Sequence, residues 1–221
     1  MRILLAAAAL AAMTIGTDAQ AGQDQRVASD PGDSQSEPAP QPPPAPHRID
    51  EPFGKAWLGA ADGDVSLIVF ADYACPACRA AQPVIDQLLA TDPRLRIVYR
   101  ILINEEDGRA AALTSLAVAG SGGDWAAFHR ALDEAGAPSP ATIAAALSKA
   151  GVDPKSLPKL DDESLVDSPI MAELMNNDAL IGQRHGTAVP AGVIGEGKAL
   201  NGFDLAWLKA AIAAARARKR D

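Results

Sequence analysis

The apolar residues of the chain recur with two different spacings, which predict where strands and helices lie. Val65 to Phe70 is a short, β-branched apolar run that fits a strand buried on both faces. A stretch with helical spacing follows and ends before Pro93, and residues 96–103 form a second strand-like run. A strand, a helix and a strand with tight joints form a βαβ unit, so we expect the two strands to be parallel. The apolar stripe of the expected helix consists of Ala81, Ile85, Leu88 and Leu89.

Residues 105–186 have a helical pattern throughout, and we expect about four helices there. The starts of these helices carry capping residues. Asp124 precedes one of them, and Ser139-Pro140 and Ser168-Pro169 each pair an N-cap residue with proline at the first helical position. This block is therefore expected to be a helical segment between two parts of an α/β fold.

Two short strands and a helix are expected after the helical block. Residues 190–195 and 198–202 read as the strands, and Asp204 begins an amphipathic helix in which Leu205, Leu208 and Ile212 align. The predicted order is thus βαβ, a helical block, and ββα.

The first 21 residues have the pattern of a secretory signal peptide. Arg2 precedes an apolar run from Ile3 to Ile15, and Ala19-Gln20-Ala21 has small residues at the two positions that signal peptidase reads. We expect cleavage after Ala21. The alternative is a retained N-terminal anchor, although the run is shorter than the about 20 residues that span a bilayer. Residues 22–49 are rich in Gln, Asp, Ser, Pro and Ala, and we expect them to form a disordered linker.

Composition narrows the functional classes. Hydrophobic residues make up 48% and charged residues 22% of the 221, which is typical of a globular protein. A formal net charge of −8 argues against a general nucleic-acid binder, which needs Lys and Arg to displace counterions from phosphate. The basic residues of the last turn are expected to lie in solvent and to complement the dipole of the final helix. These are Arg216, Arg218, Lys219 and Arg220.

The only two cysteines form the sequence Cys75-Pro76-Ala77-Cys78, at the expected junction of a strand and a helix. Residues three apart in the first turn of a helix are close enough for a disulfide. Free backbone N–H groups and the helix dipole favour negative charge on Cys75, so we expect its thiolate to be stabilised. A stabilised thiolate is also a good leaving group, so a disulfide at this position passes readily to other thiols.

Other interpretations of the two cysteines stay open. A structural disulfide would close so short a loop that its entropic contribution would be small. Zinc needs four ligands, and the chain offers only His47, His129 and His185 besides the cysteines. We interpret His129 and His185 as partly exposed residues and predict no metal site. A Cu(I) carrier that uses both cysteines and His185 is a further alternative, as is a redox-inert domain that binds extended peptides.

The segments "VSLIVFADYACPACRAAQPVIDQL" and "HGTAVPAGVIG" resemble the DsbA-like family of thioredoxin-fold thiol:disulfide oxidoreductases. The resemblance covers about residues 54–215 and implies a thioredoxin fold with a helical insertion. It implies that Cys75 is the nucleophile and Cys78 the resolving cysteine. It also implies a cis peptide bond between Val189 and Pro190, in a loop that faces the active site and whose Val189 offers backbone bonds to substrate.

The chain departs from the family pattern at two places. Many members carry a carboxylate six residues before the nucleophile, where this chain has Val69. The nearest acid is Asp72, which becomes the candidate for proton handling. The dipeptide Pro76-Ala77, which we expect to contact substrate, lacks the histidine of the strongest oxidases, so we expect a less extreme oxidant.

We therefore expect a periplasmic or secreted protein-disulfide oxidoreductase, foremost an oxidase, with a reductase or isomerase of the same fold as the alternative. Its partners would be protein thiols and disulfides and a membrane-bound redox partner that recycles it. No cofactor, nucleic acid or stable membrane insertion after signal cleavage is expected. We expect a monomer, because the linker has no apolar stripe from which to build a stalk. The expected domains are the signal peptide at 1–21, the linker at 22–49, a thioredoxin-like domain at 50–104 and 187–221, and the helical insertion at 105–186.

Overall fold

A computed structural model describes residues 48–183, 188–194 and 200–219 of the chain. These residues belong to one compact unit. The expected signal peptide and nearly all of the expected linker lie outside the described residues, as do His47 and His185. In the described part of the chain, no helix has both the length and the apolar character needed to cross a membrane.

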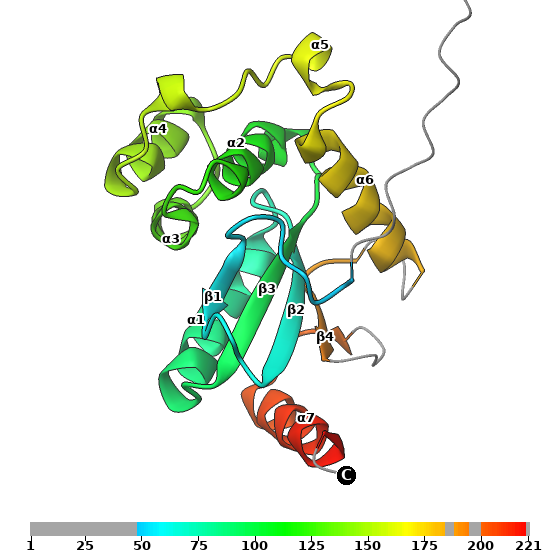
Figure 1. Cartoon of the computed structure of the whole chain (residues 1–221). Helices are drawn as coiled ribbons and strands as arrows, with labels where there is room; N and C mark the ends of the chain where they lie inside the picture. Colours follow the sequence, from blue (N-terminus) through cyan, green and yellow to red (C-terminus); the bar gives the residue numbers. More distant parts are fainter. Residues whose placement is uncertain (1–47, 184–187, 195–199, 220–221) are drawn as a thin grey trace, which may run out of the picture. The chain divides into compact units, whose positions relative to one another are not determined.

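Among the described residues, a five-stranded mixed sheet forms the centre of the fold, with the strand order β1-β3-β2-β4-β5. Figure 1 labels the first four of these strands. The two strands predicted from the apolar runs, β2 and β3, pair in parallel as expected, while the other three pairings are antiparallel. The short strand β1 was not predicted. The strands are β1 (Trp57–Gly59), β2 (Val65–Ala71), β3 (Leu95–Ile101), β4 (Ala191–Ile194) and β5 (Leu200–Asn201).

Alternate side chains of β2 enter two separate apolar clusters, one on each face of the sheet. Leu67 and Val69 pack with residues of helices α1 (Pro76–Thr91) and α7 (Leu205–Arg218). Ile68 and Phe70 pack with residues of α6 (Pro169–Gly182). Burial on both faces explains why β2 is a continuous apolar run rather than an alternating one. The fold is therefore α/β, as predicted.

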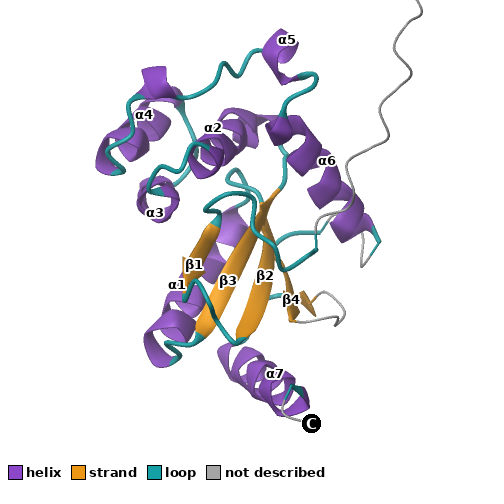
Figure 2. Cartoon of the chain, viewed as in Figure 1, coloured by secondary structure: helices purple, strands orange, loops and turns teal. Residues whose placement is uncertain are grey.

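The segment between β3 and β4 is helical, as expected, and contains five α-helices and two 3₁₀ turns among the described residues (Figure 2). The expectation was about four helices, and the additional one is a single turn. Asp124, Ser139 and Ser168 cap α3, α4 and α6 through their side chains, which confirms the predicted helix starts. The elements are η1 (Glu106–Gly108), α2 (Arg109–Gly120), α3 (Trp125–Ala135), α4 (Pro140–Lys149), η2 (Pro154–Ser156), α5 (Asp162–Leu165) and α6 (Pro169–Gly182).

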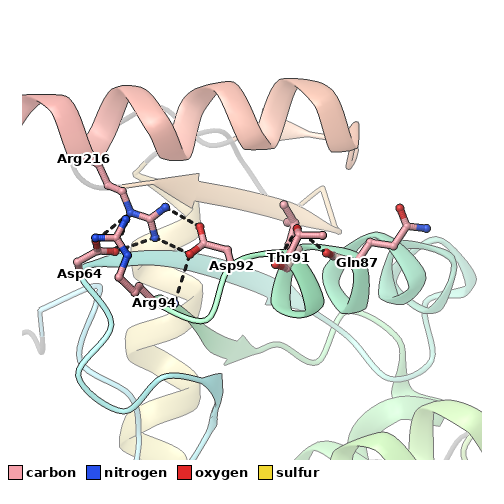
Figure 3. A network of polar contacts seen from close by, with 7 residues as sticks. Asp64, Gln87, Thr91, Asp92, Arg94 and Arg216 are labelled. Atoms are coloured by element: carbon pink, nitrogen blue, oxygen red, sulfur yellow. Dashed lines mark hydrogen bonds and ion pairs between the residues drawn. The ribbon is translucent and has the colours of Figure 1, made fainter.

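Arg216 holds the last helix against the rest of the fold (Figure 3). Its guanidinium donates to Asp64 at 2.8 Å and to Asp92 at 2.6 Å, which join the start of β2 and the end of α1 to α7. Hydrogen bonding to Arg216 is the largest cause that lowers the pKa of Asp64. The expectation that this residue lies in solvent was wrong for Arg216, because only 16% of its side chain is exposed.

A buried ion pair fixes α6 and the chain entering the sheet. Arg100 of β3 donates to Glu173 of α6 at 2.6 Å, and both side chains are buried. Nη2 of Arg100 donates to the carbonyl oxygens of Arg48 at 2.8 Å and Glu51 at 2.6 Å. These additional bonds satisfy donors that burial would otherwise leave without partners.

Candidate active site

Cys75 is the N-cap residue of α1, at the point where the chain leaves β2. Its backbone is extended, and its sulfur accepts a hydrogen bond from the N–H of Cys78 at 3.3 Å. Pro76 occupies the first turn, where its missing N–H has no cost. The sulfur of Cys75 thus lies at the end of a helix dipole that favours negative charge. Both cysteines are free thiols in the structure, and each is partly exposed.

The environment of Cys78 differs from that of Cys75. Burial is the largest cause that raises the pKa of the Cys78 thiol, and the hydrogen bond with Cys75 raises it further. Cys78 is therefore held as a thiol at neutral pH. The two sulfurs of one short motif thus differ, because Cys75 lies at the helix cap and burial raises the pKa of Cys78.

The loop containing Val189 and Pro190 lies directly against the first cysteine. The peptide bond between these two residues is cis, as the family resemblance implied. The thiol of Cys75 donates to the carbonyl oxygen of Val189 at 3.8 Å. An apolar groove runs along this loop and the start of α1. It is lined by Ala77, Ala80, Ala81, Ala188, Val189, Pro190, Gly202 and Phe203.

Asp72, the candidate for proton handling, is buried at the end of β2. Its carboxylate accepts three backbone hydrogen bonds, from Ala74 at 2.8 Å, Asn104 at 2.7 Å and Glu105 at 2.9 Å. These bonds connect the turn before Cys75 to the loop that follows β3. Gly108 fits beside this carboxylate because a Cβ there would collide with Asp72 Oδ1.

A small cavity lies behind the cysteines and brings Asp72 and Cys78 together with residues of α3. Its volume is about 20 Å³, which is room for about one water molecule. Val69 lies in its wall, so that position supplies no carboxylate to it. A different carboxylate, that of Asp133 on α3, does line it. The other lining residues include Tyr73, Gln82, Tyr99, His129 and Pro190.

Asp133 is the acidic residue of this site that the sequence analysis missed. Burial is the largest cause that raises its pKa, to about 6; Asp86 and Glu134 raise it further, while Arg79 opposes the shift. A sequence signal for it exists, because Asp133 follows His129 by four residues on the amphipathic helix α3. Two polar residues at that spacing share one face of a helix.

His129 was expected to be partly exposed, and this was wrong, because only 3% of it is exposed. Its ring stacks on Trp125, with centroids 4.7 Å apart and an interplanar angle of 10°. Burial is the main cause that lowers the pKa of His129 to about 3, with Arg130 contributing. The imidazole is therefore neutral at physiological pH, and its apolar neighbours account for its burial in the core.

A chain of hydrogen bonds connects His129 to the interior of the helical segment. The indole N–H of Trp125 donates to Ser115 Oγ at 2.8 Å. The Ser115 hydroxyl lies 2.8 Å from the Tyr73 hydroxyl, which in turn lies 3.0 Å from His129 Nδ1. His129 Nε2 is buried and has no hydrogen-bond partner. This nitrogen belongs to a residue that lines the cavity.

Metal binding has little support in the part of the chain that the structure describes. No group of three or more His, Cys, Asp or Glu side chains there is arranged to hold a metal ion. His185, the third ligand of the Cu(I) alternative, lies outside the described residues.

Comparison with known proteins gives one family match. The model of the family described as Thioredoxin matches residues 53–212, which is most of the chain. No curated protein matches the chain.

Solved structures of similar fold come from several bacteria. A thioredoxin-like oxidoreductase from Silicibacter pomeroyi DSS-3 is 28% identical, with a TM-score of 0.64 over 76% of this chain and 95% of that chain. A periplasmic thioredoxin-like protein from Salmonella enterica serovar Typhimurium is 22% identical, with a TM-score of 0.63 over 76% and 94%. The thiol-disulfide exchange protein alpha-DsbA2 from Wolbachia pipientis is 22% identical, with a TM-score of 0.60 over 72% and 86%. These structures share the fold of the described part of this chain.

Proposed function

Because the chain belongs to the thioredoxin family, we propose that it is a protein-disulfide oxidoreductase that exchanges disulfides with protein thiols through Cys75 and Cys78. The observation that carries this proposal is the position of Cys75 Sγ, at the N-cap of α1 and next to the Val189 carbonyl. A partly exposed sulfur at a helix start beside an apolar groove can meet a sulfur on another chain.

In the reducing direction, the Cys75 thiolate attacks a sulfur of the substrate disulfide, and the other substrate sulfur leaves as a thiolate. The sulfur of Cys78 then attacks Cys75 in the mixed disulfide. The bond between Cys75 and Cys78 forms while the second substrate sulfur leaves. The enzyme ends oxidised and the substrate reduced by two electrons.

In the oxidising direction, a substrate thiolate attacks Cys75 of the enzyme disulfide and Cys78 leaves. A second substrate thiolate then attacks the substrate sulfur of the mixed disulfide, and Cys75 leaves as the thiolate. A helix N-terminus stabilises this leaving group in each cycle.

The groove supports a substrate that is an extended peptide segment. Backbone atoms of Val189 would pair with the segment, and the exposed Pro76 and Ala77 would contact residues beside its cysteine. Alanine side chains and Phe203 line much of the groove, so apolar substrate side chains fit it best. Edge pairing of this kind gives affinity through the main chain and selectivity through alternate side chains.

The net reaction that we propose is oxidation of protein thiols in the periplasm or outside the cell, after cleavage at Ala21 and with a membrane-bound protein that restores the disulfide. Two proteins of similar structure, an oxidoreductase and a thiol-disulfide exchange protein, support the general reaction. The apolar N-terminal run supports export. A reductase or isomerase is the alternative, because Pro76-Ala77 lacks a histidine that would hold the thiolate.

Two assays test this function. Cys75→Ser should abolish both oxidation of a dithiol peptide and reduction of insulin, and unchanged rates in Cys75→Ser would reject the proposal. Equilibration of the Cys75/Cys78 couple with glutathione then fixes the direction. A potential near that of thioredoxin, about −270 mV, would assign a reductase, and one well above the glutathione poise an oxidase.

A further inference from the structure

The cavity behind the cysteines is lined by the resolving cysteine and by a carboxylate that has no part in the proposed exchange. Cys78 and Asp133 line the same cavity, one from α1 and the other from α3. The volume of about 20 Å³ is enough for about one water molecule, which is the smallest bridge between two groups that do not touch. The lining is polar enough to hold it, because Asp72, Tyr73 and His129 also contribute.

Cys78 needs a partner for its proton in both directions of exchange. Burial and the bond to Cys75 keep Cys78 protonated at neutral pH, yet it must attack as a thiolate and must leave as one. A thiolate that stays charged in this shielded position is disfavoured. A nearby base whose pKa is close to working pH would remove and return the proton efficiently.

Asp133 has the properties that this task requires. It is half-buried, and its raised pKa of about 6 puts its two protonation states within reach of neutral pH. Charged groups on two helices act on it, Arg79 and Asp86 from α1 and Glu134 from α3. The remaining titratable groups that face the cavity are Asp72, Tyr73, Cys78, Tyr99 and His129.

The hydrogen-bond chain through His129 supplies a donor for a water in the cavity. The contacts allow an arrangement in which Ser115 accepts from Trp125 and donates to Tyr73, and Tyr73 donates to His129 Nδ1, so that each hydroxyl proton is used once. The neutral imidazole then carries its proton on Nε2, the buried nitrogen without a partner. His129 precedes Asp133 by one helical turn, on the same face of α3.

Asp72 is the other carboxylate on this cavity, and its hydrogen bonds give it a structural role. Its two oxygens already accept three backbone N–H groups from two loops. A proton on Asp72 would weaken bonds that hold both loops. In the described structure, the Asp133 carboxylate accepts no backbone hydrogen bond.

We propose that Asp133 accepts the proton of Cys78, and returns it, through a single water in this cavity. The inference rests on the proposed function. In the reducing direction, the Cys78 proton passes through the water to the Asp133 carboxylate. The sulfur of Cys78 forms a bond with Cys75, and the bond between Cys75 and the substrate breaks with its electron pair on the substrate sulfur. In the oxidising direction, Cys78 leaves with the electron pair and takes the proton from Asp133.

The experiment uses the full reduced protein and 5,5′-dithiobis(2-nitrobenzoate), whose reaction releases thionitrobenzoate in two phases. The first phase reports attack by Cys75, and the second, which becomes independent of reagent concentration, reports attack by Cys78 on the mixed disulfide. The variants are Asp133→Asn, Asp133→Glu and Asp72→Asn. Glu134→Gln is the matched control, because it removes the same charge from an exposed position on the same helix, and Glu134 is the smallest of the influences on the pKa of Asp133.

In the wild type, the second phase should accelerate as pH rises through about 6 and then level off. Asp133→Asn should slow it about 100-fold at neutral pH, with a rate that keeps rising about tenfold per pH unit. Asp133→Glu should recover most of the rate, and Glu134→Gln should change it less than about twofold. The first phase should be unaffected in Asp133→Asn, Asp133→Glu and Glu134→Gln.

An unchanged second phase and pH profile in Asp133→Asn would overturn the inference, as would an equal loss in Glu134→Gln or a loss confined to Asp72→Asn. None of these outcomes touches the proposed function, because the first phase would persist. Absence of both phases in the folded wild type would instead reject the exchange function itself.

Discussion

The sulfur of Cys75 lies 3.8 Å from the carbonyl oxygen of Val189, although 114 residues separate the two along the chain. The site therefore depends on β4, which follows Pro190 and pairs with β2, the strand that leads into Cys75. Pairing between these strands fixes the loop against the cysteine. The groove for substrate arises from the same arrangement, since the start of α1 and the loop at Val189 both line it.

A charge placed in this groove should weaken substrate binding while leaving the sulfur chemistry intact. We expect Ala80→Asp to raise the KM for a peptide substrate about tenfold, because an apolar contact would be replaced by a carboxylate that must lose its water. Reaction of Cys75 with a small disulfide should stay within about twofold of the wild type. Ala90→Asp, an equal change at the exposed far end of α1, is the control. Equal KM values for the two variants would show that the groove does not bind the peptide.

The three bonds to Asp72 should matter for stability. Asp72→Ala leaves three backbone N–H groups without their acceptor, and we expect the free energy of unfolding to fall by about 3 kcal/mol. Urea denaturation monitored by circular dichroism measures this loss. Asp62→Ala, at an exposed position, should change the unfolding free energy by less than about 0.5 kcal/mol. Similar values for the two variants would contradict the structural part assigned to Asp72.

Burial of neutral His129 should make stability depend on pH. Its pKa is about 3 in the folded chain and about 6.5 when unfolded, so the unfolded chain binds the extra proton between these values. Stability from this group is complete above about pH 6.5 and falls by about 1.4 kcal/mol per pH unit below it. Asp133 acts in the opposite sense, because its raised pKa favours the folded chain as pH falls toward 4.

The comparison of wild type with His129→Phe isolates the histidine. The unfolding free energy of the wild type should decline relative to that of His129→Phe as the pH is lowered from about 6.5 to 4.5. Chemical denaturation at several pH values gives both curves. A difference that does not change with pH would mean that the imidazole is accessible to protons in the folded chain.

The ion pairs of Arg216 should stabilise the attachment of α7. Arg216→Gln should lower the urea midpoint, because Asp64 and Asp92 would face each other without their shared cation. The loss should shrink in about 1 M salt, where the screening length is about 3 Å. Arg218→Gln, an exposed change on the same helix, should leave the midpoint unchanged. A loss in Arg216→Gln that is insensitive to salt would point to packing of its aliphatic stem instead.

Local pattern predicts much of this fold and the centre of the site. The apolar runs identified β2 and β3, the capping residues identified three helix starts, and the spacing of Cys75 and Cys78 identified the reactive turn. Each of these features depends on neighbours within a few residues. That is why they can be found in a sequence without knowledge of the fold.

The features that the sequence did not reveal depend on distant partners. Strand β1 is three residues long and is specified by its pairing with β3. The exposure of Arg216 is decided by two aspartates more than a hundred residues earlier. Asp133 joins the site only because α3 packs behind the cysteines. The division into domains and the export signal stay predictions.

The most direct test of the account is the identity of the sulfur that forms the mixed disulfide. Cys78→Ala and Cys75→Ala should each be incubated with an oxidised peptide disulfide, and the adducts mapped by mass spectrometry. We expect Cys78→Ala to accumulate a stable adduct on Cys75, and Cys75→Ala to form almost none, because the raised pKa of Cys78 keeps its thiol protonated. Equal adducts in both variants, or none on Cys75, would contradict the account.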